Sequence, residues 1–352
     1  MVPDAACNFV DSTGDLELDE RILELAKSVG GVNDFCLLAE MIATAVGMAK
    51  GVADHGDFKL ANRALKEMRK SCEVFHAFRG RPKVALFGSA RTQPDERAYQ
   101  TAVEFSRRMA EEGYMTITGA GPGIMAAGNE GATAANSFGL NITLPFEAAA
   151  NEFIAGDPKL IDYNYFFTRK LAFVKEADAA VGMPGGVGTQ DEIFEALTLI
   201  QTGKARLYPV VCLDAPGGTY WKSWKKFVSE HLFRLGMISK SDFSLFKVTD
   251  RVEEAVAEIT RFYSNFHSYR YVGDRLVIRI QTALTEAAMD DLNVRFASMV
   301  KSGRIEACGA LPEETNEPDL ANLPRIVFRH QRRDFGQLRE FIDVLNGEEV
   351  AG

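Results

Sequence analysis

Cysteine is scarce in this 352-residue chain, and its five cysteines are scattered. No Cys-x-x-Cys pair and no cysteine–histidine spacing typical of zinc is present. We therefore expect no metal site and no disulfide framework, and we expect a reducing, cytoplasmic location. Long apolar runs are also missing, because Glu40 and Lys50 interrupt the most apolar stretch, residues 35–53. The acidic first twenty residues are not typical of a signal peptide.

An excess of basic residues is absent as well. The formal net charge is −9, which argues against binding to nucleic acid or to an anionic membrane. A local anion site stays possible, because backbone amides carry no formal charge. The hydrophobic content of 46% and charged content of 25% are typical of a globular protein.

What the chain does contain is a clear change of pattern along its length. Residues 19–78 have apolar positions recurring at intervals of three and four, which predicts helices, and Pro82 ends this region. From residue 83 onward, strands alternate with helices, which indicates βαβ units and a parallel sheet covered on both faces. We predict strands at 83–90, 114–118, 139–144, 179–183 and 207–214, and helices at 95–113, 124–135, 165–178, 190–203, 220–233 and 250–266.

After residue 266 the pattern changes again and predicts a small β-α-β-β-α module, with residues 312–324 as a solvated loop. The predicted fold is α/β: a Rossmann-like, doubly wound parallel sheet with an N-terminal helical region and a small C-terminal α+β module. The expected domains are 1–80 (helical), 81–266 (nucleotide-binding and catalytic) and 267–352 (α+β).

Two glycine-rich loops follow predicted strands, at the carboxyl ends where ligands bind in sheets of this class. Glycine lets the backbone approach a ligand, and the next helix offers free amides and its positive dipole end to an anion. The loop residues are Gly119, Gly121 and Gly123 in TGAGPG, and Gly185, Gly186, Gly188 and Thr189 in PGGVGT.

These loops match neither a dinucleotide motif nor a triphosphate motif. Ile124 stands where G-x-G-x-x-G requires its last glycine, and the chain lacks G-x-x-x-x-G-K-[ST]. Two anion-binding turns without a lysine suit a nucleoside monophosphate better than a triphosphate.

Charged residues near the loops have a structural and a functional interpretation. Glu192 completes a capping box with Thr189, which local sequence favours, or it faces a ligand. Arg169 and Lys170 lie early on a predicted helix, where the dipole disfavours cations unless an anion is close. A solvated helix face is the alternative for this pair.

Other polar positions are more evenly balanced. Arg91 is either a nucleotide contact or a loop cation, while Glu147 and Asn151 either reach the ligand or order their loop. The segment RHQRR at 329–333 is interpreted as a solvated basic turn, with binding of an effector phosphate as the alternative.

Five ordered blocks resemble the LOG ("lonely guy") family, which is often mislabelled lysine decarboxylase. PGGVGTQDE is similar to the family signature P-G-G-x-G-T-x-x-E, and FGSAR, TGAGPGIMAAGNEGA, LPFEAAAN and FFTRK resemble its other blocks. The match spans residues 83–266, and the length resembles the larger bacterial members. No lysine lies in a recognisable pyridoxal-phosphate context.

The resemblance implies a phosphoribohydrolase that cleaves the N-glycosidic bond of nucleoside 5′-monophosphates, such as AMP or cytokinin nucleotides. The products would be the free base and ribose 5-phosphate, with no cofactor, and the protein would be a homo-oligomer (a dimer or larger). By motif, Arg169 and Glu192 would be the catalytic pair. The substrate and phosphate contacts would be Gly185, Gly186, Gly188, Thr189, Gly119, Gly121, Gly123, Ser89, Arg91, Glu147 and Lys170.

The chain departs from the family pattern around the nucleoside. Ala120 stands where a glycine is common, Ala126 where many members have glutamate, and Ala148 where glutamine is frequent. These changes bear on the preferred base more than on the reaction.

The expected mechanism places a carboxylate beside a cationic sugar. Glu192 would stabilise the oxocarbenium-like state and polarise the attacking water, and the helix dipole would keep it ionised. Arg169 would act electrostatically, because arginine does not readily give up a proton. Two other interpretations stay open: a nucleotide sensor or carrier that does not cleave its ligand, and a scaffold for a larger assembly.

Overall fold

The computed structural model describes residues 12–29, 34–51, 53–144 and 149–350. The chain divides into two compact units, Met1–Arg69 and Lys70–Gly352. In the described part of the chain, no helix combines the length and apolarity needed to cross a bilayer.

The first unit is helical, as predicted. Helices α1 (Leu16–Ser28) and α2 (Phe35–Lys50) begin at aspartates that cap free backbone amides, and a third helix, α3 (His55–His76), continues into the second unit. The first two helices pack through small and branched side chains, among them Ile22, Ala26 and Ala39. Cys36 is disulfide-bonded, a feature that the scattered cysteines did not predict.

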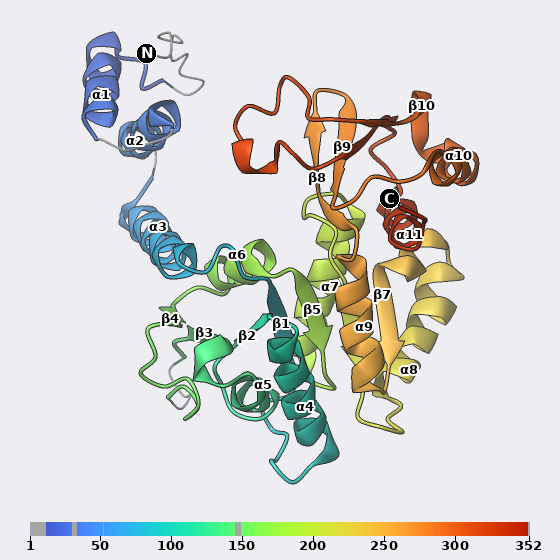
Figure 1. Ribbon diagram of the computed structural model, residues 1–352. Coiled ribbons are helices and arrows are strands. Elements are labelled where there is room, and N and C mark those ends of the chain that lie inside the picture. Colours follow the sequence, from blue (N-terminus) through green and yellow to red (C-terminus); the bar gives the residue numbers. More distant parts are fainter. Residues whose placement is uncertain (1–11, 30–33, 52, 145–148, 351–352) are drawn as a thin grey trace. The chain divides into compact units, whose positions relative to one another are not determined.

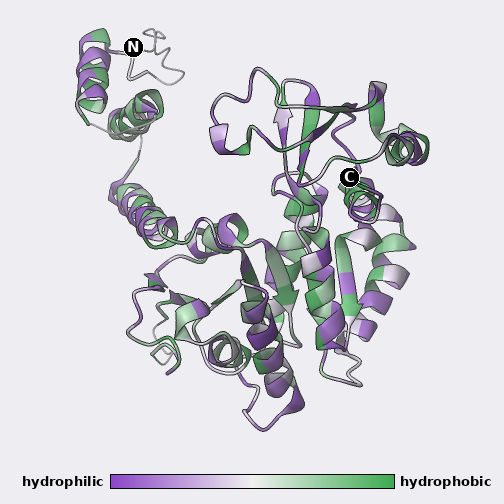
Figure 2. Cartoon of the chain, viewed as in Figure 1, coloured by the Kyte–Doolittle hydropathy of each residue, from purple (hydrophilic) through white to green (hydrophobic). Residues whose placement is uncertain are grey.

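The second unit is built on a seven-stranded parallel sheet with the order β4-β3-β2-β1-β5-β6-β7 (Figure 1). Its strands are β1 (Lys83–Phe87), β2 (Met115–Thr118), β3 (Ser137–Ile142), β4 (Leu160–Tyr163), β5 (Ala179–Gly182), β6 (Val210–Leu213) and β7 (Phe246–Thr249). The central strands are hydrophobic along their length (Figure 2), because helices cover both of their faces. The predicted Rossmann-like α/β fold is confirmed.

The two faces of the sheet follow from the alternation of side chains along each strand. Val84 and Leu86 of β1 point into one core, whereas Ala85 and Phe87 belong to the opposite face. Helices α4 (Arg97–Glu111), α5 (Ile124–Ala132) and α9 (Val252–Phe262) cover the first face. Helices α6 (Phe166–Glu176), α7 (Val187–Gln201) and α8 (Tyr220–Phe227) and the end of α3 cover the second.

The C-terminal part forms a second sheet, antiparallel, with the order β10-β11-β9-β8. Its elements are β8 (Phe266–Val272), β9 (Arg275–Ile280), α10 (Glu286–Arg295), β10 (Val300–Cys308), β11 (Arg325–His330) and α11 (Phe335–Leu345). The predicted β-α-β-β-α order is wrong in lacking β8. The predicted helix 250–266 ends on Phe266, the first residue of this strand, and residues 267–272 were not predicted as a strand. Strands β4 and β7 were also missed, because each has only four residues and includes a charged one.

The C-terminal sheet and helices share a hydrophobic core with the Rossmann-like part. Leu338 and Ile342 of α11 belong to the same buried cluster as Ile193 and Ile200 of α7. The connector 312–324 is not the expected solvated loop, because Glu314 is buried and pairs with two buried arginines, Arg279 and Arg325.

Candidate functional site

The central cavity lies where the direction of strand addition reverses. From β1 the chain adds β2, β3 and β4 on one side, and then β5 on the other side of β1. In open α/β sheets, ligands bind at this switch point, beyond the carboxyl ends of the strands. The loops after β1 and β5 meet there, where the Ser89 amide donates to the Pro184 carbonyl at 3.2 Å.

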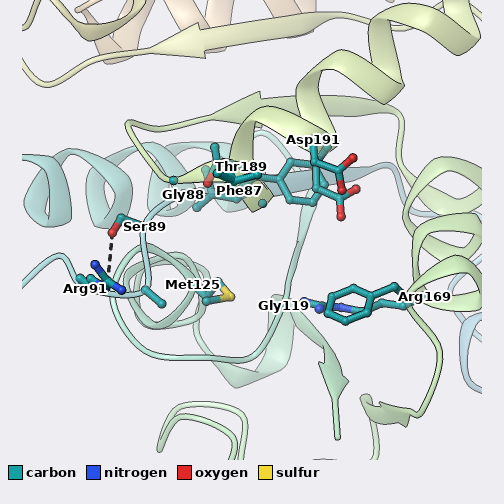
Figure 3. A pocket seen from close by; sticks show the side chains of 16 residues that line it. Phe87, Gly88, Ser89, Arg91, Gly119, Met125, Arg169, Thr189 and Asp191 are labelled. Atoms are coloured by element: carbon teal, nitrogen blue, oxygen red, sulfur yellow. Dashed lines mark hydrogen bonds between the residues drawn. The ribbon is translucent and has the colours of Figure 1, made fainter. Parts of the chain in front are cut away.

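A cavity of about 630 Å³ opens between these loops, α6 and the start of α7 (Figure 3). Many of the residues expected at the site line it: Ser89, Arg91, Gly119, Arg169, Gly186, Gly188, Thr189 and Glu192. Gly121, Gly123, Gly185 and Lys170 are not among its lining residues. Glu147 lies outside the described residues.

Helix α7 begins earlier than a capping box would require. Its N-cap is Gly186, which has no side chain to cap the helix, and its first residue is Val187. Thr189 is therefore the third helical residue and Glu192 the sixth, so the capping-box interpretation is wrong. The first-turn amides, from Val187 to Thr189, have no partner within the helix and border the cavity. They are available to an anion.

Glu192 lies deeper along α7 than expected, and its charge is controlled by burial. Its side chain is 17% exposed, and burial raises its pKa to about 7, against the opposing effects of Lys170 and Arg169. The expectation that the helix dipole keeps it ionised is wrong, because the dipole acts mainly within the first turn. At neutral pH this carboxyl can both accept and release a proton.

Lys170 holds the carboxylates of α7 instead of lining the cavity. Its Nζ lies 2.6 Å from Asp191 Oδ2 and 3.8 Å from Glu192 Oε1, and it also pairs with Glu195. This lysine of α6 therefore connects α6 to α7 through ion pairs with Glu192 and its neighbouring carboxylates.

Arg169 occupies space that Gly119 leaves open. A Cβ on Gly119 would lie 2.2 Å from Arg169 Nη2 and 2.7 Å from Met125 Sδ. The guanidinium also lies over the Phe173 ring, 5.6 Å from its centroid. Figure 3 shows Arg169 beside Gly119, across the cavity from Thr189 and Asp191. The glycine at this position thus makes room for the arginine.

The rest of the first glycine loop faces the protein. Gly123, the N-cap of α5, has φ +66°, and its Cβ would lie 2.3 Å from the Ser89 carbonyl oxygen. That oxygen accepts a hydrogen bond from the Ile124 amide at 3.0 Å, so the start of α5 is covered. Ala120 has φ +62°, a left-handed conformation that explains why glycine suits this position.

Asn151 orders this loop, as one of its two interpretations predicted. Its Nδ2 donates to the carbonyl oxygens of Ala120 and Gly121, each at 3.0 Å. Arg91 lines the cavity, and its amide donates to Ser89 Oγ at 3.1 Å.

The sequence did not predict the apolar residues that line the cavity, or one hydrogen bond that supports the PGG turn. Phe87, Met125, Phe166 and Val187 line the cavity. Each lies within one of the blocks that resemble the family, which is the signal that could have identified them. Tyr220 Oη donates to the Gly185 carbonyl at 2.6 Å and so braces the PGG turn from α8, a contact that no sequence pattern indicates.

Residues 125–259 match a family model described as "Possible lysine decarboxylase". No curated protein matches the chain.

Three solved structures are similar to part of the chain. The molybdenum cofactor binding protein from Rippkaea orientalis has 18% identity and a TM-score of 0.38, covering 51% of this chain and 96% of that one. The molybdenum cofactor carrier protein from Chlamydomonas reinhardtii has 22% identity and a TM-score of 0.37, covering 51% and 97%. DNA processing protein A from Streptococcus pneumoniae has 12% identity and a TM-score of 0.37, covering 72% and 94%.

The family model covers Arg169 and the PGGVGTQDE segment, two of the parts of the chain that meet at the cavity, but not the loop after β1 or Gly119. The matched segment is thus similar to the family with this description, and the same segment carries several of the blocks that resemble the LOG family.

Proposed function

We propose that this protein hydrolyses the N-glycosidic bond of nucleoside 5′-monophosphates, giving a free base and ribose 5-phosphate. The family supports a nucleotide-related role. The observation that carries the finer proposal is that one cavity joins the free amides of the first turn of α7, the buried carboxyl of Glu192 and the guanidinium of Arg169.

The start of α7 is proposed to bind the phosphate. The amides from Val187 to Thr189 and the Thr189 hydroxyl offer hydrogen-bond donors to it, and the helix dipole favours the negative charge. A phosphate held there would place the ribose further along the helix, toward Glu192. Phosphate binding would then supply energy for positioning the sugar.

Glu192 is proposed to be the general base. Breaking the ribosyl C–N bond leaves positive charge on the sugar, and the ionised carboxylate would stabilise that charge. The attacking water would give its proton to Glu192 as its oxygen bonds to the ribosyl carbon, and the base would leave with the electron pair of the broken bond. A pKa of about 7 suits proton acceptance near neutral pH.

Arg169 is proposed to anchor the nucleotide from the opposite wall. Its guanidinium keeps its proton, so its contribution is electrostatic and not that of a general acid. The apolar side chains of Phe87, Met125 and Phe166 offer flat or soft surfaces to the base. A cavity of about 630 Å³ falls within the usual size range of small-molecule sites.

A second copy of the chain is proposed to cover the mouth of the cavity. Val187 is 87% exposed and Phe166 is 52% exposed, and Phe167 and Leu171 of α6 are also exposed. Such a cluster is typical of a surface that another protein covers. We further propose that the protein is a homo-oligomer, that it needs no cofactor and that it acts in the cytoplasm.

The test is incubation of the full-length protein with a panel of nucleoside 5′-monophosphates, followed by chromatography. Release of the free base with equimolar ribose 5-phosphate is the expected result. Tight binding with intact nucleotide would instead establish the carrier or sensor function.

A further inference from the structure

A second hollow, of about 350 Å³, lies in the C-terminal part of the chain, far in sequence from the family motifs. It is formed by the turn between β11 and α11, the start of β10 and the turn between β8 and β9. Its lining residues are Asp274, Lys301, His330, Gln331, Arg332 and Arg333, and we refer to it as the basic hollow.

The cations of the basic hollow differ from the others around them. Every other arginine after residue 266 forms an ion pair with a carboxylate: Arg270, Arg275, Arg279, Arg295, Arg304, Arg325, Arg329 and Arg339. Among the described residues, no ion pair involves Arg332, Arg333 or Lys301, and Lys301 is the only lysine after residue 266. Within the described residues after 266, the cations without a carboxylate thus converge on one hollow, in a chain whose net charge is −9.

Arg332 is held in place before any ligand arrives. Its guanidinium lies 4.4 Å from the centroid of the Tyr271 ring, and its Nη2 donates to the Gly273 carbonyl at 2.6 Å. Its backbone has φ +55°, a conformation disfavoured for residues other than glycine. A side chain fixed in this way loses less conformational freedom on binding.

The neighbouring groups leave the hollow positive. Asp274 is paired with Arg329 at 3.1 Å, and Asp334 caps α11 by accepting from the Gln337 amide at 3.0 Å. His330 is buried, and burial, assisted by Arg332, lowers its pKa to about 4, so its ring is neutral at pH 7. The positive charge therefore comes from Lys301, Arg332 and Arg333.

We propose that the basic hollow binds the phosphate group of a small molecule, either free phosphate or a phosphate ester. Guanidinium groups bind phosphate oxygens through paired, charge-assisted hydrogen bonds, and the ammonium of Lys301 adds a third cation. The volume admits a phosphate with a small group attached. This site is separate from the proposed nucleotide cavity and does not depend on the proposed reaction.

The test is hydrogen–deuterium exchange of the full-length protein with inorganic phosphate, with ribose 5-phosphate, and with potassium chloride at equal ionic strength. We expect slower exchange in residues 299–303 and 330–337 with at least one of the two phosphate compounds. With potassium chloride we expect the exchange rates of these residues to stay unchanged. Peptides over residues 186–192 report separately on the other cavity. Slower exchange with the ester alone identifies the ligand as an ester, and slower exchange with both identifies phosphate itself.

Variants then locate the site. The double substitution Lys301→Gln with Arg333→Gln should weaken phosphate binding in calorimetry by about tenfold or more, because charge-assisted hydrogen bonds are lost. The matched control is Arg304→Gln, which removes an exposed arginine paired with Asp290 in the same part of the chain. No protection at 330–337 with either compound, the same protection with chloride, or unchanged affinity in the double variant would overturn the proposal.

Discussion

The Lys170 ammonium lies 3.8 Å from a carboxylate oxygen of Glu192, and it also contacts the carboxylates of Asp191 and Glu195. It is thus the cation that most strongly opposes the effect of burial on Glu192. The proton affinity of the proposed base depends on this neighbour, which lies behind α7 and outside the cavity lining.

The pH profile of the reaction should report this contact. The ionised form of Glu192 is needed to accept a proton, so kcat/KM should rise with pH through about 7, the pKa to which burial raises this carboxyl. Lys170→Met removes a charge that lowers this pKa, so the rise should move to higher pH. The pH at which kcat/KM rises is measured from steady-state rates between pH 5 and 9, for the parent and for the variant. Lys175→Met, on an exposed part of the same helix, is the control. An unmoved profile in Lys170→Met would show that the titrating group is not Glu192.

Replacing Glu192 by glutamine should separate binding from turnover. We expect AMP binding to persist and kcat to fall by about 100- to 10,000-fold, the usual contribution of general acid–base catalysis. Calorimetry and chromatographic rates measure the two effects. Glu195→Gln is the matched control, because Glu195 lies one turn further along α7 and also contacts Lys170 but does not line the cavity. Equal rates in the parent and in Glu192→Gln contradict the assignment.

Gly119→Ala should displace Arg169. The added methyl would lie 2.2 Å from Nη2, so the guanidinium must move away from its position over Phe173. We expect kcat/KM to fall by about tenfold or more, because a displacement of about 1 Å can cost that much in a positioned site. Gly80→Ala, where the new methyl has no neighbour within 4 Å, is the control. Should both variants retain parental rates, Arg169 has no role that depends on its position.

The sequence predicted the alternation of strands and helices because a parallel sheet buried on both faces requires apolar strands between amphipathic helices. It did not predict β4 and β7, whose four-residue runs LIDY and FKVT are too short and too polar to show a period. Tertiary pairing with β3 and β6, not local preference, makes them strands.

The sequence predicted many of the residues that form the candidate site, but not the contacts that set their positions and pKa values. The residues of the loops after β1 and β5 and the Arg169–Glu192 pair meet at one cavity, as their motifs suggested. The proton affinity of Glu192 was not predictable, because it depends on burial and on Lys170 from another helix. The space made for Arg169 by Gly119 is likewise a contact between residues fifty positions apart.

The buried acid of the C-terminal connector should matter for stability. Glu314 accepts from Arg279 and Arg325, and all three side chains are almost fully buried. Glu314→Ala leaves two buried cations without this partner, so the free energy of unfolding should fall by about 3–5 kcal/mol. The neighbouring Glu313→Ala breaks only an exposed pair with Arg275 and should cost at most about 1 kcal/mol. Urea denaturation measures both, and equal values would show that the buried cluster does not stabilise the fold.

One side of α7 holds Glu192 at the cavity, while Ile193 and Ile200 are buried with Leu338 and Ile342 of α11. The terminal segment and the Rossmann-like part therefore bury apolar surface in one continuous cluster. A shorter relative lacking α11 is expected to carry polar residues at the positions of α7 that α11 contacts here, and such substitutions would trace the gain or loss of this segment through evolution.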